Sequence, residues 1–482
     1  MAMLRRECLL VIQHVIVLVI FISKSHGKGS SVSYNSGTGV LLFGSNDLGW
    51  ANIVVTDLYA HRTVNGELNS ECHPAGVSSN VRTSTSDTDC VKVEIESTRS
   101  DIDAGICFDF GQAMWYGGSE LQYQRWPIQN NISLPWQLYT TNDIVPSNQT
   151  FGNVLERYWL NSKGVGIYIE EGVPLHATIF DHSNGKNEPR MCLFARNRPQ
   201  ATESHPPSRT INLHMCLTEN ILQTHQLMTH KFFNYPEGHP DERMMKSPIW
   251  STWAKYKTDI SEDNILQYAS EIVEHGFSNS QLEIDDIFST RYGDFDFDPI
   301  KFTDPKRMIN KLKELGFRVT VWITPFANED SVAFKEGLEK GYWLLDMAGE
   351  KPALVNWWRG VGAILDVEKP EAVDWYLGRL EEMKSSYGVD SFKFDAGELT
   401  FVPEEHEYLT KWTDPTMYTT KYVNAVSRMG PMIEVRTYIS VHVTSSSFTV
   451  TLMFFQHCLV NSMFCSYTYV SLWIMCFSMT HE

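Results

Sequence analysis

Short segments of alternating hydrophobic and polar residues recur through the first half of the chain. Clusters of Gly, Ser, Asn and Pro separate them, and examples are residues 91–95, 165–169, 191–194 and 211–215. A period of two puts apolar side chains on one face of a strand and polar side chains on the other. The pattern predicts an N-terminal antiparallel β-sandwich domain over residues 28–240, without a helix.

The pattern changes after a turn-rich stretch at 236–241 and Pro248. Strand-like segments then alternate with helices that carry N-cap residues and C-terminal glycines. The expected strands are 249–252, 281–285, 317–324, 390–394 and 432–436, and the expected helices are 261–276, 304–316, 331–340, 416–428 and one that begins at Pro370. Repeated strand–helix units predict a parallel sheet. We expect a (β/α)8 TIM-type barrel over residues 246–436 that is incomplete, with about its first five strands.

The pattern breaks again at Thr437. Residues 437–481 contain no Lys, Arg, Asp or Glu, although charged residues make up 20% of the whole chain. Three interpretations of this uncharged tail, residues 437–482, stay open. It is translated non-coding or frame-shifted sequence in place of a true C-terminal part, a membrane tail, or a buried terminal element. The first interpretation predicts a chain that is truncated after Arg436.

The first 27 residues have the composition of a targeting segment. Arg5 and Arg6 precede an apolar run at residues 9–22, and Ser25 and Gly27 follow it in a small-x-small pattern. This predicts a signal peptide or, alternatively, an uncleaved signal anchor that holds the protein in a membrane through residues 9–22. The expected location is the secretory pathway, in the endoplasmic reticulum or Golgi lumen or outside the cell. The sequons at Asn131 and Asn148 agree with that compartment.

The cysteines and the net charge indicate which disulfides, metal ions and macromolecular partners are expected. Cys72 with Cys90, and Cys192 with Cys216, are candidate disulfide pairs in such a compartment, and buried free thiols are the alternative. The nine cysteines show no zinc-ligand spacing, and the histidines form no ligand cluster, so no metal or organic cofactor is expected. The net charge of −18 argues against a nucleic-acid partner.

Acidic residues gather where the predicted barrel strands end. Asp285 and Asp286 close the second predicted strand, and Asp395 closes the fourth. Strand ends of a barrel line its substrate-binding face, and glycoside hydrolysis uses a pair of carboxyl groups. Lys393 shares a strand face with Asp395, where an ammonium group favours an ionised carboxylate. A purely structural Lys–Asp ion pair is the alternative.

Residues 391–398 resemble the nucleophile strand of glycoside hydrolase family 31, in the branch where it reads K-x-D-x-G-E. That branch holds α-xylosidases and sulfoquinovosidases. The resemblance covers about residues 36–436. Further matching segments are 248–256, 282–288 with 292–298, 319–325, 358–376, and 108–118, which resembles a loop that reaches from the N-terminal domain toward the active site.

The resemblance implies a role for each matching residue. Asp395 would be the catalytic nucleophile that forms a covalent glycosyl-enzyme. The implied substrate-binding residues, which would contact glycone hydroxyls or shape the sugar pocket, are Asp285, Asp286, Trp253, Trp322, Trp358, Lys393 and Arg436. Trp322 lies inside an apolar strand, so an ordinary core position is its alternative.

The resemblance therefore implies a retaining α-glycosidase that acts on oligosaccharides or glycoconjugates of the α-galactoside or α-glucoside class. The family's general acid is an Asp some tens of residues beyond the nucleophile. After Glu434 the only acidic residue of this sequence is Glu482, the final residue. No candidate general acid therefore follows Arg436 in a plausible sequence context. The alternative is a truncated, catalytically inactive sugar-binding or interaction protein.

Overall fold

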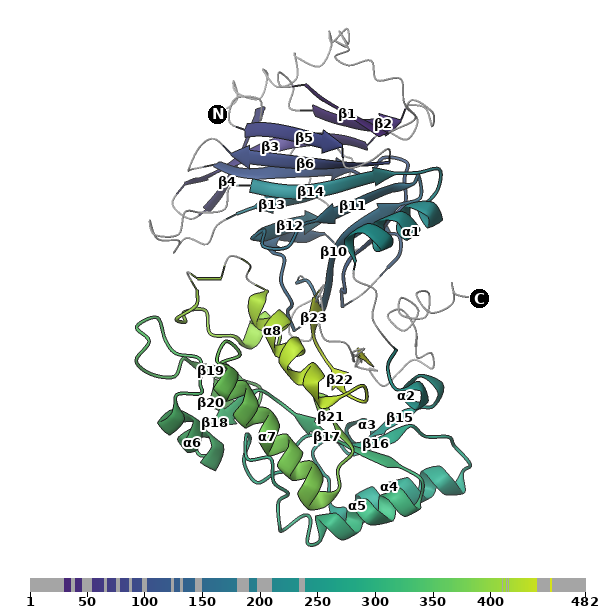
Figure 1. Ribbon diagram of the computed structural model, residues 1–482, viewed down its shortest axis with the longest axis vertical. Helices are drawn as coiled ribbons and strands as arrows, with labels where there is room; N and C mark the ends of the chain where they lie inside the picture. The colour runs from purple at the N-terminus through teal and green to yellow at the C-terminus, as the bar shows by residue number, and fades with distance from the viewer. Residues whose placement is uncertain are drawn as a thin grey trace.

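The computed structural model of the chain shows a β-rich N-terminal part above a part in which strands and helices alternate (Figure 1). The structure describes residues 30–439 and 451–452, except for 36–39, 46–53, 65–66, 75–78, 86–88, 98–101, 123–124, 131–132, 144–149, 180–189, 197–209, 234–238, 410, 413 and 415. The predicted targeting segment, both sequons and most of the uncharged tail lie outside the described residues. No helix among the described residues has the length and apolar character needed to cross a membrane.

The N-terminal part contains two sheets, and all pairs between its own strands are antiparallel. One has the order β1-β2-β3-β7-β13-β12-β9, with β4 paired to β3. Its strands are β1 (Ser30–Asn35), β2 (Val40–Ser45), β3 (Val54–Val64), β4 (Glu67–Pro74), β7 (Ile102–Asp109), β9 (Leu134–Leu138), β12 (Leu175–Ile179) and β13 (Arg190–Ala195). The other has the order β23-β10-β11-β14-β6-β5, with β8 paired to β10. It contains β5 (Ser79–Thr85), β6 (Cys90–Ser97), β8 (Trp115–Ser119), β10 (Val154–Asn161), β11 (Val165–Ile169), β14 (Thr210–Leu217) and β23 (Tyr438–Ile439).

The two sheets share one apolar core. Val93 and Ile95 of β6 are fully buried in the same cluster as Ile106 and Phe108 of β7, which belongs to the other sheet. The polar residues between them, such as Glu94, are only half-buried. Period-two alternation therefore produces one buried and one wetter face, and the four strands predicted from it are present as β6, β11, β13 and β14.

Two expectations for this part are wrong. Helix α1 (Ile221–Phe232) lies where no helix was predicted. Asn220 caps it by accepting the N–H of Gln223, and the helix buries its own Met228 in a cluster with Tyr158 and Tyr168. Both proposed disulfide pairs are wrong as well, because Cys90, Cys192 and Cys216 each bond to the cysteine opposite on a neighbouring strand. The bonds are Cys90–Cys216, between β6 and β14, and Cys107–Cys192, between β7 and β13.

The second part is built on a six-stranded sheet in which every neighbouring pair is parallel and strands follow chain order. Its strands are β15 (Ile249–Ser251), β16 (Gln281–Ile284), β17 (Arg318–Ile323), β21 (Ser391–Phe394), β22 (Glu434–Val435) and β24 (Thr451–Leu452). The helices are α2 (Glu242–Lys246), α3 (Thr252–Lys255), α4 (Glu262–Glu274), α5 (Pro305–Glu314), α6 (Val332–Lys340), α7 (Pro370–Tyr387) and α8 (Met417–Val426). A side sheet of β18 (Phe326–Asn328), β20 (Gly360–Ile364) and β19 (Leu354–Trp357) was not predicted.

The predicted strands and helices of this part agree with the structure to within a few residues. Local signals explain the agreement. Ser261 and Asn264 form a capping box at the start of α4, and Asp304 caps α5 ahead of Pro305. The five predicted strands are β15, β16, β17, β21 and β22. The sixth strand, β24, lies within the predicted uncharged tail and pairs with β22.

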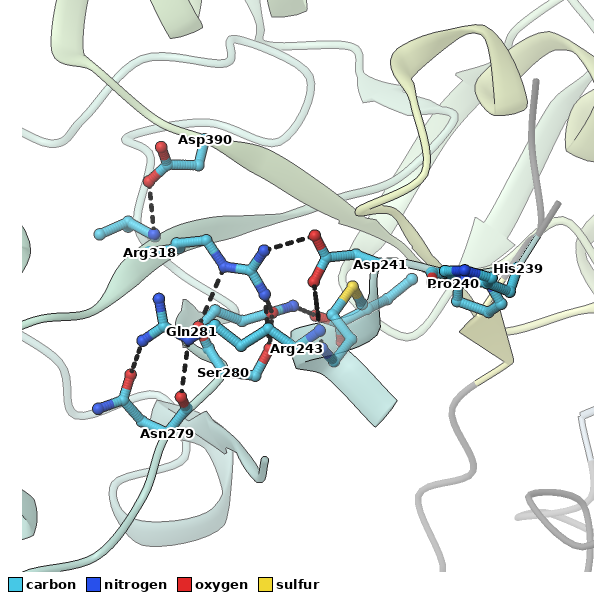
Figure 2. A network of polar contacts seen from close by, with 12 residues as sticks. His239, Pro240, Asp241, Arg243, Asn279, Ser280, Gln281, Arg318 and Asp390 are labelled. Carbon is cyan, nitrogen blue, oxygen red and sulfur yellow. Dashed lines mark hydrogen bonds and ion pairs between the residues drawn. The ribbon is translucent and has the colours of Figure 1, made fainter. Parts of the chain in front are cut away.

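A polar network closes the end of this sheet at which the strands begin (Figure 2). Arg318, the first residue of β17, bonds Asp241 at 2.8 Å, the hydroxyl of Ser280 at 2.8 Å and the carbonyl of Ser280 at 3.2 Å. Arg243 of α2 bonds the side chain and carbonyl of Asn279. The network ties the connector before the sheet to β16 and β17, far along the strands from their carboxyl ends.

We expect Arg318→Met to destabilise this part by about 1–3 kcal/mol without altering the site, because it removes the guanidinium that bonds Oδ2 of Asp241 and both oxygens of Ser280. Chemical denaturation followed by tryptophan fluorescence measures the loss. Arg291→Met is the matched control, since its ion pair with Asp330 is exposed and worth at most about 1 kcal/mol. Equal losses in the two variants would contradict a stabilising role for the network.

Several bonds fix the N-terminal part to the carboxyl-end side of the parallel sheet. Leu399 donates its N–H to the carbonyl of Thr141 at 2.9 Å, and Thr141 and Thr419 share a hydroxyl bond of 2.8 Å. The buried pair of Arg157 and Asp414 lies at 2.6 Å. Residues near 141 therefore hold a fixed position beside the segment that follows β21.

Candidate active site

Asp395 lies at the carboxyl end of β21, immediately after Phe394. Trp322 donates its indole N–H to Oδ2 of Asp395 at 2.8 Å, and Arg436 Nη1 lies 3.2 Å from Oδ1. The N–H of Ala396 also donates to Oδ1, at 3.0 Å. The side chain of Asp395 keeps 15% of its surface exposed. A carboxylate that is held by three donors and still open to solvent can approach a substrate atom.

Ala396 has a left-handed backbone, with φ of +60°. Non-glycine residues rarely adopt this region, and such residues concentrate at functional sites. The turn directs the backbone N–H of Ala396 back to the carboxylate that precedes it.

Lys393 and Asp285 form a buried ion pair of 2.8 Å beside Asp395. Lys393 also lies 2.9 Å from Oε1 of Glu283, a buried residue in the middle of β16. Burial alone would lower the pKa of the Lys393 ammonium, but the carboxylates of Asp285, Glu283 and Asp395 raise it above its usual value. Burial opposes ionisation of Asp285, yet Lys393 and the other donors hold its pKa below the usual range. The ion pair predicted for Lys393 and Asp395 is therefore made with Asp285.

Asp286 is held by different partners. It accepts bonds from the Tyr292 hydroxyl at 2.8 Å and from Arg359 Nε and Nη2 at 2.7 and 2.6 Å. Burial raises its pKa, although Tyr292 and Arg359 oppose that rise. Sequence reasoning missed Arg359, whose only signal was its place next to Trp358 in a segment that resembled the family.

Arg436, directly after β22, connects the site to the N-terminal part. Its guanidinium lies 2.8 Å from Asp143, 3.2 Å from Asp395 and 3.5 Å from Glu398. Burial would lower its pKa, but these carboxyl groups raise it above the usual value. The guanidinium carbon also lies 5.4 Å from the ring centroid of Trp358. Asp143 and Glu398 were not predicted, and for Asp143 the sequence offers no signal because it depends on tertiary packing.

The three predicted tryptophans have different surroundings. Trp322 is buried in the core, as its alternative interpretation expected, and its indole also bonds Asp395, while its part in binding a sugar stays a prediction. Trp358 is 37% exposed and packs edge-on against Trp357 and Phe401. Trp253 lies on α3, where Lys257 Nζ is 4.8 Å from its ring centroid. Within the described part of the chain, the hydrogen bonds and ring contacts of Trp253 do not involve Asp395 or Arg436.

The segment at 108–118 resembles a loop that reaches toward the active site, and that role stays a prediction. Phe108, Phe110 and Trp115 pack in the core of the N-terminal part. The contact with Arg436 comes from Asp143, which follows β9. The N-terminal part therefore reaches the candidate site through Asp143.

The site contains the accessible carboxylate of Asp395, the ion pairs Lys393–Asp285 and Arg359–Asp286, and the partly exposed ring of Trp358. Burial raises the pKa of Glu398 to about 7, a value that suits a general acid. However, Glu398 has no exposed surface and cannot reach a leaving-group oxygen. Within the described residues we assign no general acid. That part of the chain also shows no group of three or more His, Cys, Asp or Glu side chains arranged to hold a metal.

Comparison with known proteins places this geometry in a family. Residues 248–455 match the family model described as the glycosyl hydrolases family 31 TIM-barrel domain. The match runs past Arg436, where the sequence resemblance was expected to stop.

Two named glycosidases are similar to this chain in sequence. The mouse (Mus musculus) myogenesis-regulating glycosidase is 36% identical over 329 residues, which cover 67% of this chain and 45% of that protein. The α-xylosidase XylQ of Lactiplantibacillus pentosus is 30% identical over 191 residues, or 37% of this chain and 24% of that protein. This chain thus spans less than half the length of each of these two relatives.

Solved structures share the fold. A family 31 sulfoquinovosidase from E. rectale, solved with an aza-sugar inhibitor, superposes with a TM-score of 0.57 at 12% identity, over 88% of this chain and 63% of that one. A dextranase of the same family from Flavobacterium johnsoniae, solved with glucose, gives 0.55 at 13% identity, over 86% and 55%. The family-model match and the 36% identical mouse relative, and not these distant structures, show that the chain belongs to glycoside hydrolase family 31, through the TIM-barrel domain that begins at residue 248.

Proposed function

We propose that this chain carries the nucleophile of a retaining α-glycosidase and that its substrates are O-glycosides of the α-galactoside or α-glucoside class. The observation that carries the proposal is the environment of Asp395. Its carboxylate is partly exposed at a strand end and is oriented by Trp322, Arg436 and the N–H of Ala396. A carboxylate fixed in this way is suited to attack an anomeric carbon and form a glycosyl ester.

The neighbouring groups would bind the sugar. Asp285 and Asp286 follow β16, which β17 separates from β21, and they supply acceptor oxygens for hydroxyl groups. Lys393 keeps Asp285 ionised, and Arg359 fixes Asp286. Because these partners are already bonded, the acceptors need little rearrangement when a sugar binds. In a retaining enzyme, the acid that protonates the leaving oxygen would lie about 5–5.5 Å from Asp395.

The fold of the chain and the cellular compartment of the protein are part of the same proposal. We propose that the two N-terminal sheets are the layers of a β-sandwich and that the chain supplies only the first strands of the barrel. Their shared core and the six parallel strands support these assignments. We also propose that the protein resides in the secretory pathway, as the sequence of its first 27 residues suggests.

Covalent trapping tests the proposal directly. Ring-fluorinated α-galactosyl fluoride and α-glucosyl fluoride carry a leaving group that needs no acid, and their glycosyl-enzymes hydrolyse slowly. We expect one of them to add one glycosyl mass to the protein, on the peptide that contains Asp395. Asp395→Asn is the control and should stay unlabelled. A label on any other carboxylate would overturn the assignment of the nucleophile.

A second candidate is a sugar-binding protein without catalytic activity. It is favoured by the lack of an assignable general acid among the described residues. Calorimetric binding of a free monosaccharide, together with no label from either fluoride at long incubation, would support this candidate and contradict the first.

A further inference from the structure

Glu398 is an unusual buried acid close to the proposed nucleophile. It lies three residues after Asp395 and has no exposed surface. Neither of its carboxyl oxygens has a hydrogen-bond partner among the described residues, and the nearest cation is Arg436 Nη2 at 3.5 Å. A buried carboxylate without hydrogen bonds is costly, so such a group tends to keep its proton.

The backbone holds Glu398 in this position from both sides. The carbonyl of Gly397 accepts the Thr419 hydroxyl at 2.8 Å, and the N–H of Leu399 donates to Thr141 at 2.9 Å. Gly397 has φ of +92°, and a Cβ atom there would lie 2.4 Å from the ring of Tyr422. The backbone on both sides of Glu398 is therefore tied to an N-terminal segment and to α8.

The surrounding charges do not balance. Asp395, Asp143 and Glu398 all lie within 3.5 Å of the single guanidinium of Arg436. Glu120, after β8, also interacts electrostatically with Arg436 and accepts the N–H of Asn153 at 3.2 Å. Four carboxyl groups thus share one cation. Burial raises the pKa of Glu398 to about 7 and that of Glu120 to about 8, although Arg436 lowers both.

The reaction proposed above would change this balance. When Asp395 attacks an α-glycosyl fluoride, its oxygen bonds to the anomeric carbon while the carbon–fluorine bond breaks and fluoride leaves with the electron pair. The carboxylate becomes a neutral ester, so the cluster loses one negative charge. Arg436 then has fewer anions to balance, and Asp395 no longer repels a charge on Glu398.

We propose that Glu398 is a charge-compensating residue for this step, which keeps its proton while Asp395 is a carboxylate and releases it to solvent when Asp395 becomes an ester. The inference rests on the proposed function, because it requires the ester to form. It assigns Glu398 to positioning and charge balance and not to contact with the sugar.

Proton release during trapping provides the test. The fluoride reagent liberates no proton when it labels a carboxylate, so any proton that appears with the label comes from the protein. A fall of about two pKa units at Glu398 would release roughly half a proton or more per labelled site between about pH 6 and 7, and about a tenth at pH 8. A pH indicator in weak buffer measures the protons, and intact mass measures the label.

Matched variants identify the residue that releases the proton. Glu398→Gln should still accept the label and lose the release. Glu434→Gln replaces another buried acid whose pKa is raised to about 7, but its charged neighbours are Lys393 and Asp285, so the release should persist. Release that persists in Glu398→Gln and disappears in Glu120→Gln would overturn the assignment to Glu398. Labelling without any release would overturn the inference alone, and a protein that takes no label would overturn the proposed function as well.

Discussion

Asp395→Ala is expected to lower kcat/KM for an α-glycosyl fluoride by on the order of 10⁵-fold, with the fold unchanged. Asp395 is the partly exposed carboxylate whose oxygens are oriented by Trp322, Arg436 and Ala396. Alanine removes the group that would form the ester and leaves a space on the same face of the sugar. Steady-state release of fluoride measures the loss, and circular dichroism confirms that the variant is folded.

Added azide sharpens the prediction. It should occupy the space left by the missing carboxylate and restore fluoride release from Asp395→Ala, with a β-glycosyl azide as the product. Trp322→Phe is the matched variant, because it keeps the nucleophile and removes one hydrogen bond to it. It should lose only about tenfold in rate, in keeping with one hydrogen bond to a charged group. Azide rescue of Asp285→Ala instead of Asp395→Ala would move the nucleophile to the end of β16.

The strands and helices of the second part could be predicted because their signals are local. Caps such as Ser261 and Asp304 sit within three residues of the backbone groups that they bond. The sequence also indicated which carboxylates meet, since the ends of neighbouring parallel strands lie at one edge. Asp285 and Asp395 are brought together in this way, through β16, β17 and β21.

Other features depend on tertiary packing, and local sequence patterns do not predict them. Asp143 contacts Arg436 although 293 positions separate them in the sequence. The disulfides follow from the register of β6 with β14 and of β7 with β13, which a single sequence does not reveal. Glu283 is a buried acid in the middle of β16, and its partner is Lys393 on β21, which β17 separates from it.

Lys393→Met is expected to cost about 3–5 kcal/mol of stability near pH 8, because it removes one partner of a buried ion pair. Methionine fills the volume of the lysine stem but leaves Asp285 without its cation. Glu283, the other partner of Lys393, supplies no cation in its place, because it is itself an acid and burial raises its pKa well above the usual value. The folded variant can therefore relieve the buried charge only by protonating Asp285.

That requirement sets the sign of the pH dependence. In the native protein the pKa of Asp285 is lowered, so its contribution to stability is present above its unfolded pKa and is lost only in strong acid. In Lys393→Met the pKa of Asp285 is raised instead, so the folded state binds one proton more than the unfolded state. The cost of the substitution should then grow by up to about 1.4 kcal/mol per pH unit as the pH rises from 5 toward the raised pKa.

Urea denaturation at a series of pH values between about 5 and 8 measures this slope for the native protein and the variant. Lys340→Met is the control, because its ion pair with Glu336 is an exposed contact between successive helical turns. It should change stability by less than about 0.5 kcal/mol at every pH. If Lys393→Met costs the same at pH 5 as at pH 8, Asp285 does not need the lysine to stay ionised. The role of Lys393 as the group that keeps Asp285 ionised would then have to be abandoned.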